Sequence, residues 1–259
     1  MTKQLLRFLP FIFILVSCER GNLYVDPDYP STYLEIPADI LLSRRTALES
    51  NYPYLKTSVD QFGFCYWPND YRDTNPPANS DLLTDVTATQ LAKNFISEHP
   101  AETGIQNLED LVIAKAYPLS GGIHWVVVTS NQKVNNTEVL FTEVVIKMTN
   151  GVLVTCEGNW FPEIYIPDKF NFNESEAKTH LVGQNVTHSN IGGDKYYVTI
   201  TKPDLNNISG ELKVVPIRTD KKIELRLTWM FNIPSPVYCK VYADVMTGEI
   251  ILQVPTIIS

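Results

Sequence analysis

The chain has 259 residues and a formal net charge of −8 at pH 7. Proteins that bind nucleic acid through its phosphates need clustered Lys and Arg, whereas the basic runs here are pairs such as Lys221-Lys222, so we exclude nucleic acid as a partner. The length is sufficient for one large domain or two small ones with a substantial buried core.

The N-terminus has the pattern of a secretory signal. Lys3 and Arg7 precede an apolar stretch that is too short to span a bilayer as a helix. The segment Leu15-Val16-Ser17-Cys18 then resembles the bacterial lipoprotein box, in which the Cys becomes the acylated first residue. An ordinary signal peptide with an incidental Cys is the alternative. We expect residues 1–17 to be a lipoprotein signal peptide, with Cys18 lipidated and the chain held on the extracytoplasmic side of a membrane of the bacterial cell envelope.

The next part of the chain is predicted to be a tether followed by an irregular region. Residues 18–35 are polar, contain Pro and show no periodicity, which is typical of a tether. Residues 36–86 are rich in aromatic residues and Pro, and we expect them to pack irregularly on the main body. Within them, the pattern of residues 38–50 is compatible with a helix.

Three aromatic residues in this region, Tyr66, Trp67 and Tyr71, allow two interpretations. Exposed, they would form a ligand platform, because aromatic rings stack on sugar rings. Buried, they would fix the irregular segment against a sheet. The sequence favours burial, and the exposure of Trp67 distinguishes the two.

A first α+β unit is predicted over residues 87–160. Thr87 or Thr89 can cap a helix that ends before Pro100. Asn150-Gly151 predicts a type I′ hairpin turn, which needs positive φ at both central residues. The expected strands are 111–117, 123–129, 138–148 and 152–157.

A second α+β unit is predicted over residues 170–256, after a joint at 160–169. Asn173 can cap a helix with Glu176 at the third position, and Gly183 can end it. The expected strands are 195–201, 211–216, 223–231, 238–244 and 249–254. Each unit is thus a helix packed on an antiparallel β meander, and each ends in a Gly-closed hairpin. The predicted class is α+β, with two related units.

The second unit resembles the PepSY domain. The resemblance is carried by Leu227-Thr-Trp229-Met-Phe231 and by the stretch Lys240–Glu249, which contains Asp244-Val-Met-Thr247-Gly248-Glu249. In the first unit, Gln132–Val139 and Val144–Gly151 resemble the propeptide motif of thermolysin-like and fungalysin-like metalloproteases. The resemblance covers roughly residues 87–254. It implies a cystatin- or PepSY-like fold and a habit of docking on, or restraining, a peptidase.

The residues that the catalytic domain of those proteases would supply do not occur in this sequence. There is no H-E-x-x-H, and no His has a His partner four residues later, so we expect no metal. The G-x-S-x-G, Walker and G-x-G-x-x-G patterns do not occur either. We therefore predict no catalytic residue, no cofactor and no enzymatic activity.

Beyond Cys18, the chain has Cys65, Cys156 and Cys239. Strand alternation indicates that Cys156 and Cys239 are small buried residues. An extracytoplasmic location also leaves open a bridge between these two cysteines.

The resulting hypothesis is a membrane-anchored, non-enzymatic lipoprotein that binds a protein partner, with an extracytoplasmic peptidase as the candidate. Edge strands would offer docking surfaces by β-augmentation. The alternative is an accessory lipoprotein that binds glycan or peptide ligands during nutrient uptake, with Tyr66, Trp67 and Tyr71 as its platform.

Overall fold

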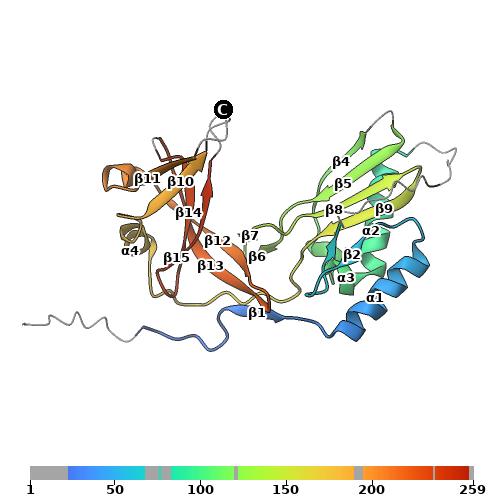
Figure 1. Cartoon of the computed structure of the whole chain (residues 1–259), viewed down its shortest axis with the longest axis horizontal. Coiled ribbons are helices and arrows are strands. Elements are labelled where there is room, and N and C mark those ends of the chain that lie inside the picture. Colours follow the sequence, from blue (N-terminus) through green and yellow to red (C-terminus); the bar gives the residue numbers. More distant parts are fainter. Residues whose placement is uncertain are drawn as a thin grey trace, which may run out of the picture.

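The computed structural model describes residues 23–67, 76, 83–119, 122–189, 195–235 and 237–256. The fold is α+β, with mostly sheets and few helices, and its elements form two lobes joined at the middle (Figure 1). The expected signal peptide (residues 1–17), Cys18 and Tyr71 lie outside the described residues.

The first lobe is a four-stranded antiparallel sheet in the order β4-β5-β8-β9, with helices on one face. Its helices are α1 (Ala38–Asn51), α2 (Asp85–Glu98) and α3 (Pro100–Thr103). Its strands are β4 (Ile113–Leu119), β5 (His124–Thr129), β8 (Val144–Thr149) and β9 (Val152–Gly158), beside the short pair β2 (Ser58–Val59) and β3 (Cys65–Tyr66).

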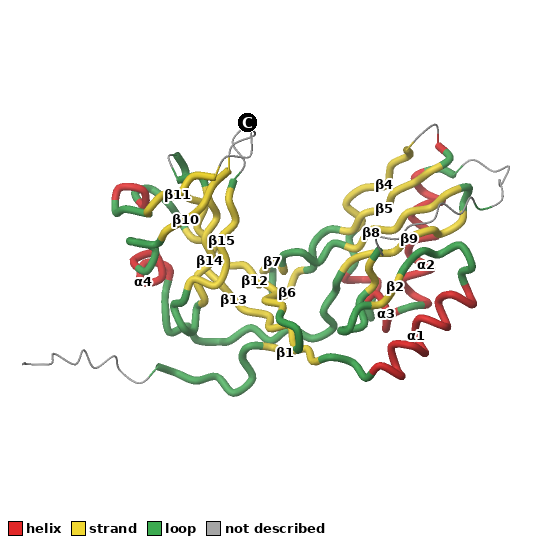
Figure 2. The backbone as a smooth tube through the Cα atoms, in the orientation of Figure 1, coloured by secondary structure: helices red, strands yellow, loops and turns green. Residues whose placement is uncertain are grey.

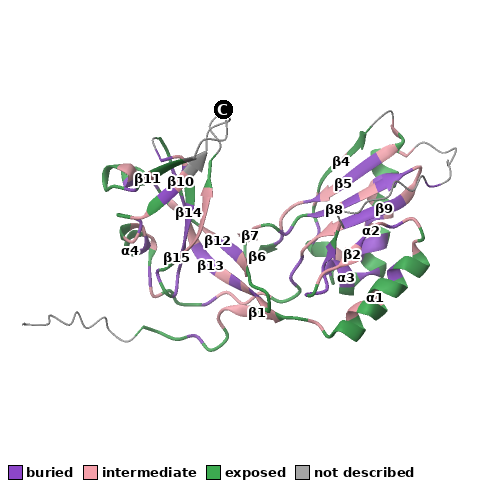
Figure 3. Cartoon of the chain, viewed as in Figure 1, coloured by how far each residue is buried: buried purple, intermediate pink, exposed green. Residues whose placement is uncertain are grey.

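Helix α2 supplies the buried face that covers this sheet. Phe95 and Ile96 are buried with Trp125 and Ile146 in one core cluster. The helix begins earlier than expected: its cap is Thr84, whose hydroxyl accepts a hydrogen bond from the backbone N–H of Thr87. Helix α1, by contrast, is exposed along most of its length (Figure 3).

The second lobe is built on a larger sheet in the order β15-β14-β13-β12-β7-β6, with β1 also paired to β13. Its own elements are α4 (Glu174–Thr179), the hairpin β10 (Asn185–Ser189) and β11 (Lys195–Thr199), and the meander β12 (Gly210–Arg218), β13 (Lys222–Ile233), β14 (Cys239–Asp244) and β15 (Ile250–Pro255). Asn173 caps α4 with Glu176 in a reciprocal pair, as predicted.

Three strands from outside the second lobe, β1, β6 and β7, complete this sheet and correct the sequence prediction. Residues 31–34, expected within the tether, form β1 (Ser31–Leu34), which pairs antiparallel with β13. The single strand expected over 138–148 is broken, because residues 140–143 form a turn. Its first part, β7 (Thr137–Val139), leaves the first lobe with β6 (Lys133–Val134) and pairs parallel with β12.

The predicted joint at 160–169 lies between two hydrophobic cores. Trp160 packs in the core of the first lobe, whereas its neighbour Phe161 packs in a second core with Phe62, Phe64 and Leu225. Residues 159–173 then run as a loop beside β1 to the second lobe (Figure 2).

The side chain of Gln132 holds the start of this loop in place. Its Nε2 donates to the carbonyl of Phe161 at 2.6 Å and its Oε1 accepts from the Phe161 N–H at 3.0 Å.

Both predicted hairpins are present as adjacent antiparallel strands, β8–β9 and β14–β15. Asn150 and Gly151 have φ of 51° and 77°, which is the positive φ that the predicted turn requires. Each lobe thus contains a helix followed in sequence by antiparallel strands, and the relation between the two units stays a prediction.

A candidate binding site between the two lobes

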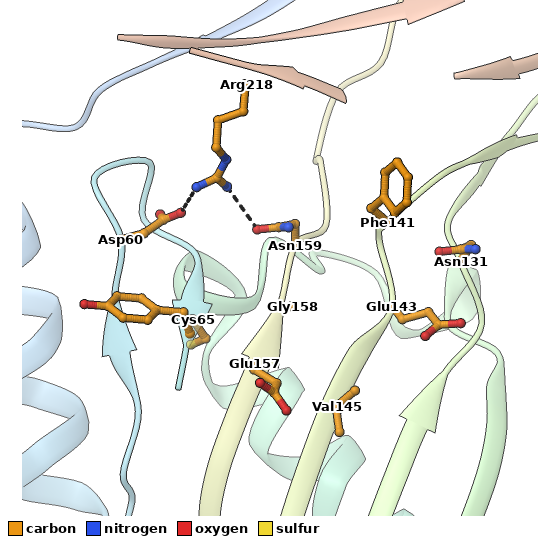
Figure 4. Close-up of a pocket in the computed structure, with 11 residues that line it drawn as sticks. Asp60, Cys65, Asn131, Phe141, Glu143, Val145, Glu157, Gly158, Asn159 and Arg218 are labelled. Atoms are coloured by element: carbon orange, nitrogen blue, oxygen red, sulfur yellow. Dashed lines mark hydrogen bonds and ion pairs between the residues drawn. The ribbon is translucent and has the colours of Figure 1, made fainter. Parts of the chain in front are cut away.

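A cavity of about 570 Å³ lies where the two lobes meet. Its walls come from the β2–β3 segment, the ends of β8 and β9, the turn before β8, and the end of β12 (Figure 4). The site therefore exists only because the chain folds the two lobes against each other.

Arg218, at the end of β12, closes one wall by reaching across to the first lobe. Its Nη1 lies 2.6 Å from Oδ2 of Asp60, and its Nη2 donates to Oδ1 of Asn159 at 3.3 Å (Figure 4). The guanidinium also lies 5.0 Å from the ring centroid of Phe62, within the range of a cation–π contact. Oδ1 of Asp60 in turn accepts from the N–H groups of Phe62 and Phe64, each at 2.9 Å. The wall is a connected polar network and holds the rim of the cavity in one geometry.

Phe141 is the most unusual residue of the site. Its φ is +61°, in the left-handed region that a bulky side chain rarely occupies, and its side chain is 59% exposed. Such a conformation costs on the order of 1–3 kcal/mol and persists only where the surroundings fix it. Backbone strain of this kind concentrates at functional sites.

Hydrogen bonds on both sides of Phe141 fix its backbone. The preceding N–H, that of Leu140, donates to the carbonyl of Val214 on β12 at 2.9 Å. The following N–H, that of Thr142, donates to Oδ1 of Asn131 at 3.0 Å. The buried Thr142 hydroxyl also donates to the carbonyl of Val139 at 2.7 Å and accepts from the N–H of Gln132 at 2.7 Å. The fold thus presents an aromatic ring at the cavity from a rigid support.

The charged groups around the cavity are mostly acidic. Asp60, Glu143 and Glu157 line it with a single guanidinium, that of Arg218. Glu157 is partly neutralised by Lys147, whose Nζ lies 3.1 Å from its carboxylate. A ligand of this cavity would meet two exposed aromatic rings, those of Phe141 and Tyr66, and the carboxylate of Glu143 beside the paired charges of Asp60 and Glu157.

The sequence predicted a different set of site residues, and the structure brings one of them to the cavity. Tyr66 lines the cavity and is 44% exposed. Trp67 is half-buried, with Nζ of Lys147 3.9 Å from its ring centroid. Tyr71 lies outside the described residues, so the three-residue platform stays a prediction.

Sequence reasoning does not identify Phe141, because the pattern of residues 138–148 predicts one continuous strand. Local sequence does not predict this turn, because two of the hydrogen bonds that fix it involve residues outside the run: the side chain of Asn131 and the carbonyl of Val214 on β12. His124 has a structural role, since its Nδ1 lies 2.9 Å from the hydroxyl of Thr149 on the neighbouring strand.

The bridge left open between Cys156 and Cys239 does not form. Cys156 is buried in the core of the first lobe, whereas Cys239 is buried in the core of the second lobe, among Val241 and Ala243. Burial raises the pKa of the Cys239 thiol to about 11.

Across the part of the chain that the structure describes, no cluster of three or more His, Cys, Asp or Glu residues could hold a metal ion. The helices in the same residues are all too short or too polar to cross a membrane.

Comparisons with known proteins give similarity to solved structures alone. No family model matches the chain, and no curated protein matches it. Among solved structures, the chain is similar to the Bacillus megaterium YpeB C-terminal domain, with 14% sequence identity and a TM-score of 0.34, over 85% of this chain and 97% of that one. A similarity of this degree identifies neither a fold nor a function.

Proposed function

We propose that this chain is a membrane-anchored, non-enzymatic lipoprotein that binds a protein partner at the cavity between its lobes. The observation that carries the proposal is Phe141, an exposed aromatic ring held in a strained conformation by hydrogen bonds on both sides. Aromatic side chains on rigid supports are the usual anchors of protein interfaces, because they bury a large apolar area and lose little conformational freedom on binding.

The partner is expected to present a basic or neutral segment to this site. Asp60 and Glu157 are paired with Arg218 and Lys147, so the charge of Glu143 remains at the cavity and would favour a positively charged segment over an acidic one. A candidate partner is an extracytoplasmic peptidase that the chain restrains, as the resemblance to PepSY and propeptide modules implies. Cys18 would hold the protein at the membrane through its lipid.

A second docking surface is available on the outer edge of the first lobe. β4 pairs only with β5 among the described strands, so one of its sides has backbone groups free to pair with an added strand. Pro118, opposite Trp125, lacks an N–H and limits such pairing to part of the strand. We therefore place the primary contact at Phe141 and treat β4 as an auxiliary surface.

The alternative is binding of glycan or peptide ligands during nutrient uptake, which the exposed ring of Tyr66 in the same cavity favours. Sugar binding needs rings that are open for stacking together with nearby polar groups. Tyr66→Ala would weaken such binding while leaving a protein complex that depends on Phe141 largely intact.

The decisive variant is Phe141→Asn, because Asn tolerates the left-handed conformation while removing the aromatic ring. The matched control is Tyr197→Ala, which removes a highly exposed ring on β11. Tagged full-length protein is expressed in its native envelope, cross-linked and purified, and the partners are identified by mass spectrometry.

We expect the wild type and Tyr197→Ala to recover the same partner, and Phe141→Asn to recover at least tenfold less. The stability of Phe141→Asn should be equal to or above that of the wild type, because strain is relieved. Equal recovery by all three proteins would refute the role of Phe141. Absence of any partner, together with no inhibition of envelope peptidases, would refute the binding function.

The membrane anchor is tested separately by Cys18→Ser. This variant should move from the membrane fraction to the soluble fraction after cell lysis. An unchanged distribution would refute lipidation at Cys18.

A further inference from the structure

Two thiols meet in the core of the first lobe. Cys65 on β3 is 3% exposed and Cys156 on β9 is 0% exposed, and both belong to the same hydrophobic cluster. Strand β3 packs against β9, and Cys65 lines the same cavity as Glu157, the residue next to Cys156. A disulfide needs two Cys whose side chains already face each other, since the S–S bond is only about 2.05 Å long.

The backbone around the two cysteines is held by further contacts between the same segments. The hydroxyl of Thr57 donates to the carbonyl of Cys156 at 2.9 Å, and it accepts from the Cys156 N–H at 2.7 Å. The N–H of Lys56 donates to the carbonyl of Val154 at 2.6 Å. The β2–β3 pair places Cys65 opposite Val59, within the same short hairpin. The irregular N-terminal region is thus fixed along the edge of β9 at the level of Cys156.

We propose that Cys65 and Cys156 form a disulfide bond that joins the N-terminal region to the edge strand of the first lobe. The proposal rests on the extracytoplasmic location proposed above, because disulfides persist in oxidising compartments. Cys239 lies in the core of the other lobe and stays a free thiol.

The reaction is a two-electron oxidation by thiol–disulfide exchange. One Cys, as its thiolate, attacks the disulfide of an oxidant, a thiol–disulfide oxidoreductase in the cell or oxidised glutathione in vitro, and forms a mixed disulfide. The other Cys then displaces the oxidant's remaining sulfur. Two thiols become one disulfide, and the oxidant leaves as two thiols that carry the two electrons and two protons.

The burial of both thiols predicts that this reaction occurs early in folding. The hydrogen bond with Cys65, followed by burial, raises the pKa of Cys156 well above its usual range. A thiol with a raised pKa is a poor nucleophile at neutral pH, and a fully buried one is out of reach of an oxidant. We therefore expect the bond to form before the core closes, and the reduced folded protein to oxidise slowly.

The test begins with the full-length chain purified from its native envelope, after free thiols are blocked by alkylation at harvest. A separate sample is reduced, unfolded in guanidinium and refolded with a mixture of reduced and oxidised glutathione. Non-reducing digestion and mass spectrometry then locate the linked peptides in both samples.

We expect a linked pair containing Cys65 and Cys156, with Cys239 alkylated, in both samples. The control variant Cys239→Ala should keep the bridge, whereas Cys65→Ala should leave Cys156 available for alkylation under denaturing conditions. The double variant Cys65→Ala/Cys156→Ala serves as the permanently unbridged reference. Dithiothreitol should lower the urea midpoint of the wild type and of Cys239→Ala and leave that of the double variant unchanged.

Recovery of all three thiols in reduced form from the refolded sample would overturn the pairing. A bridge that forms on refolding but is missing from the protein taken from cells would count against the extracytoplasmic location instead. Failure of the disulfide and failure of the proposed location are therefore distinguishable, and both are independent of the partner recovered through Phe141.

Discussion

Replacement of Asp244 by Asn should destabilise the protein by about 3–4 kcal/mol. The carboxylate is fully buried and accepts four hydrogen bonds. Oδ1 accepts from the N–H groups of Met246 and Thr247 at 2.7 and 2.9 Å, and Oδ2 accepts from the hydroxyl of Tyr29 at 3.0 Å and from Nη1 of Arg226 at 3.2 Å. All four partners are donors, so the site is built for an acceptor on both sides.

The expected loss of stability follows from the hydrogen bonds that an Asn side chain can and cannot make at this position. The carbonyl of Asn can replace one carboxylate oxygen, but its NH₂ group must then face a pair of donors. Two hydrogen bonds to a charged acceptor are lost, at about 1.5–3 kcal/mol each. Part of the loss is recovered, because Tyr29 also donates to the carbonyl of Leu227 at 3.2 Å and Arg226 keeps its contact with Glu224 at 2.7 Å. These gains place the expected loss of stability in the lower half of the range that two lost hydrogen bonds would give, which is about 3–6 kcal/mol.

Urea unfolding followed by tryptophan fluorescence measures this change. With a slope of about 2–3 kcal/mol/M for a chain of this size, the midpoint of Asp244→Asn should fall by roughly 1–2 M. The control, Asp220→Asn, makes the same chemical change at an exposed position and should move the midpoint by less than about 0.2 M. Equal midpoints for the two variants would refute the argument that the buried carboxylate organises the turn after β14.

Two further predictions concern the space around Gly248 and the stability of the fold at low pH. In Gly248→Ala, the new Cβ would lie 2.6 Å from Cε1 of His180 at a φ of +70°. We expect a loss of about 2–3 kcal/mol, against about 1 kcal/mol for Gly183→Ala, which has a φ of +86° and open space. Equal losses in urea unfolding would contradict the clash. The hydrogen bond from Lys213 lowers the pKa of Glu138 from its usual 4.5, so this ion pair stabilises the fold above that pH and its contribution is lost on further acidification. Glu138→Gln should therefore show a smaller drop in urea midpoint between pH 6 and pH 3 than the wild type, and an unchanged drop would contradict the assignment.

The parts of the fold that the sequence predicts are those specified by local chemistry. Asn150-Gly151 determines its hairpin because both positions need positive φ, and Asn173 with Glu176 starts its helix through a reciprocal cap. The alternation in β13 predicts a buried face, and Leu225, Leu227 and Phe231 on this face lie in hydrophobic cores. Trp229 on the same face is only partly buried, and Thr228 on the opposite face is fully buried. These signals lie within a few residues of the structure that they specify.

The parts that the sequence does not predict depend on distant partners. β1 has four residues and β6 only two, so neither gives a periodic signal, and each is a strand only because another strand lies beside it. The exposure and strain of Phe141 come from hydrogen bonds to Asn131 and Val214. The proximity of Cys65 to Cys156 likewise depends on the placement of the β2–β3 hairpin. The candidate site therefore cannot be predicted from local sequence, apart from Tyr66, which lines the cavity.

The pairing of β1 with β13 also bears on how the protein is made. Ser31 lies opposite Leu225 in this ladder, so one of the earliest strands to leave the ribosome pairs with one of the latest. Contacts of such long sequence separation slow folding, because the chain ends must meet before any stabilisation is gained. β1 cannot join the second sheet until residues 222–225 have been synthesised. The strand order itself thus delays completion of this sheet until most of the chain has been synthesised.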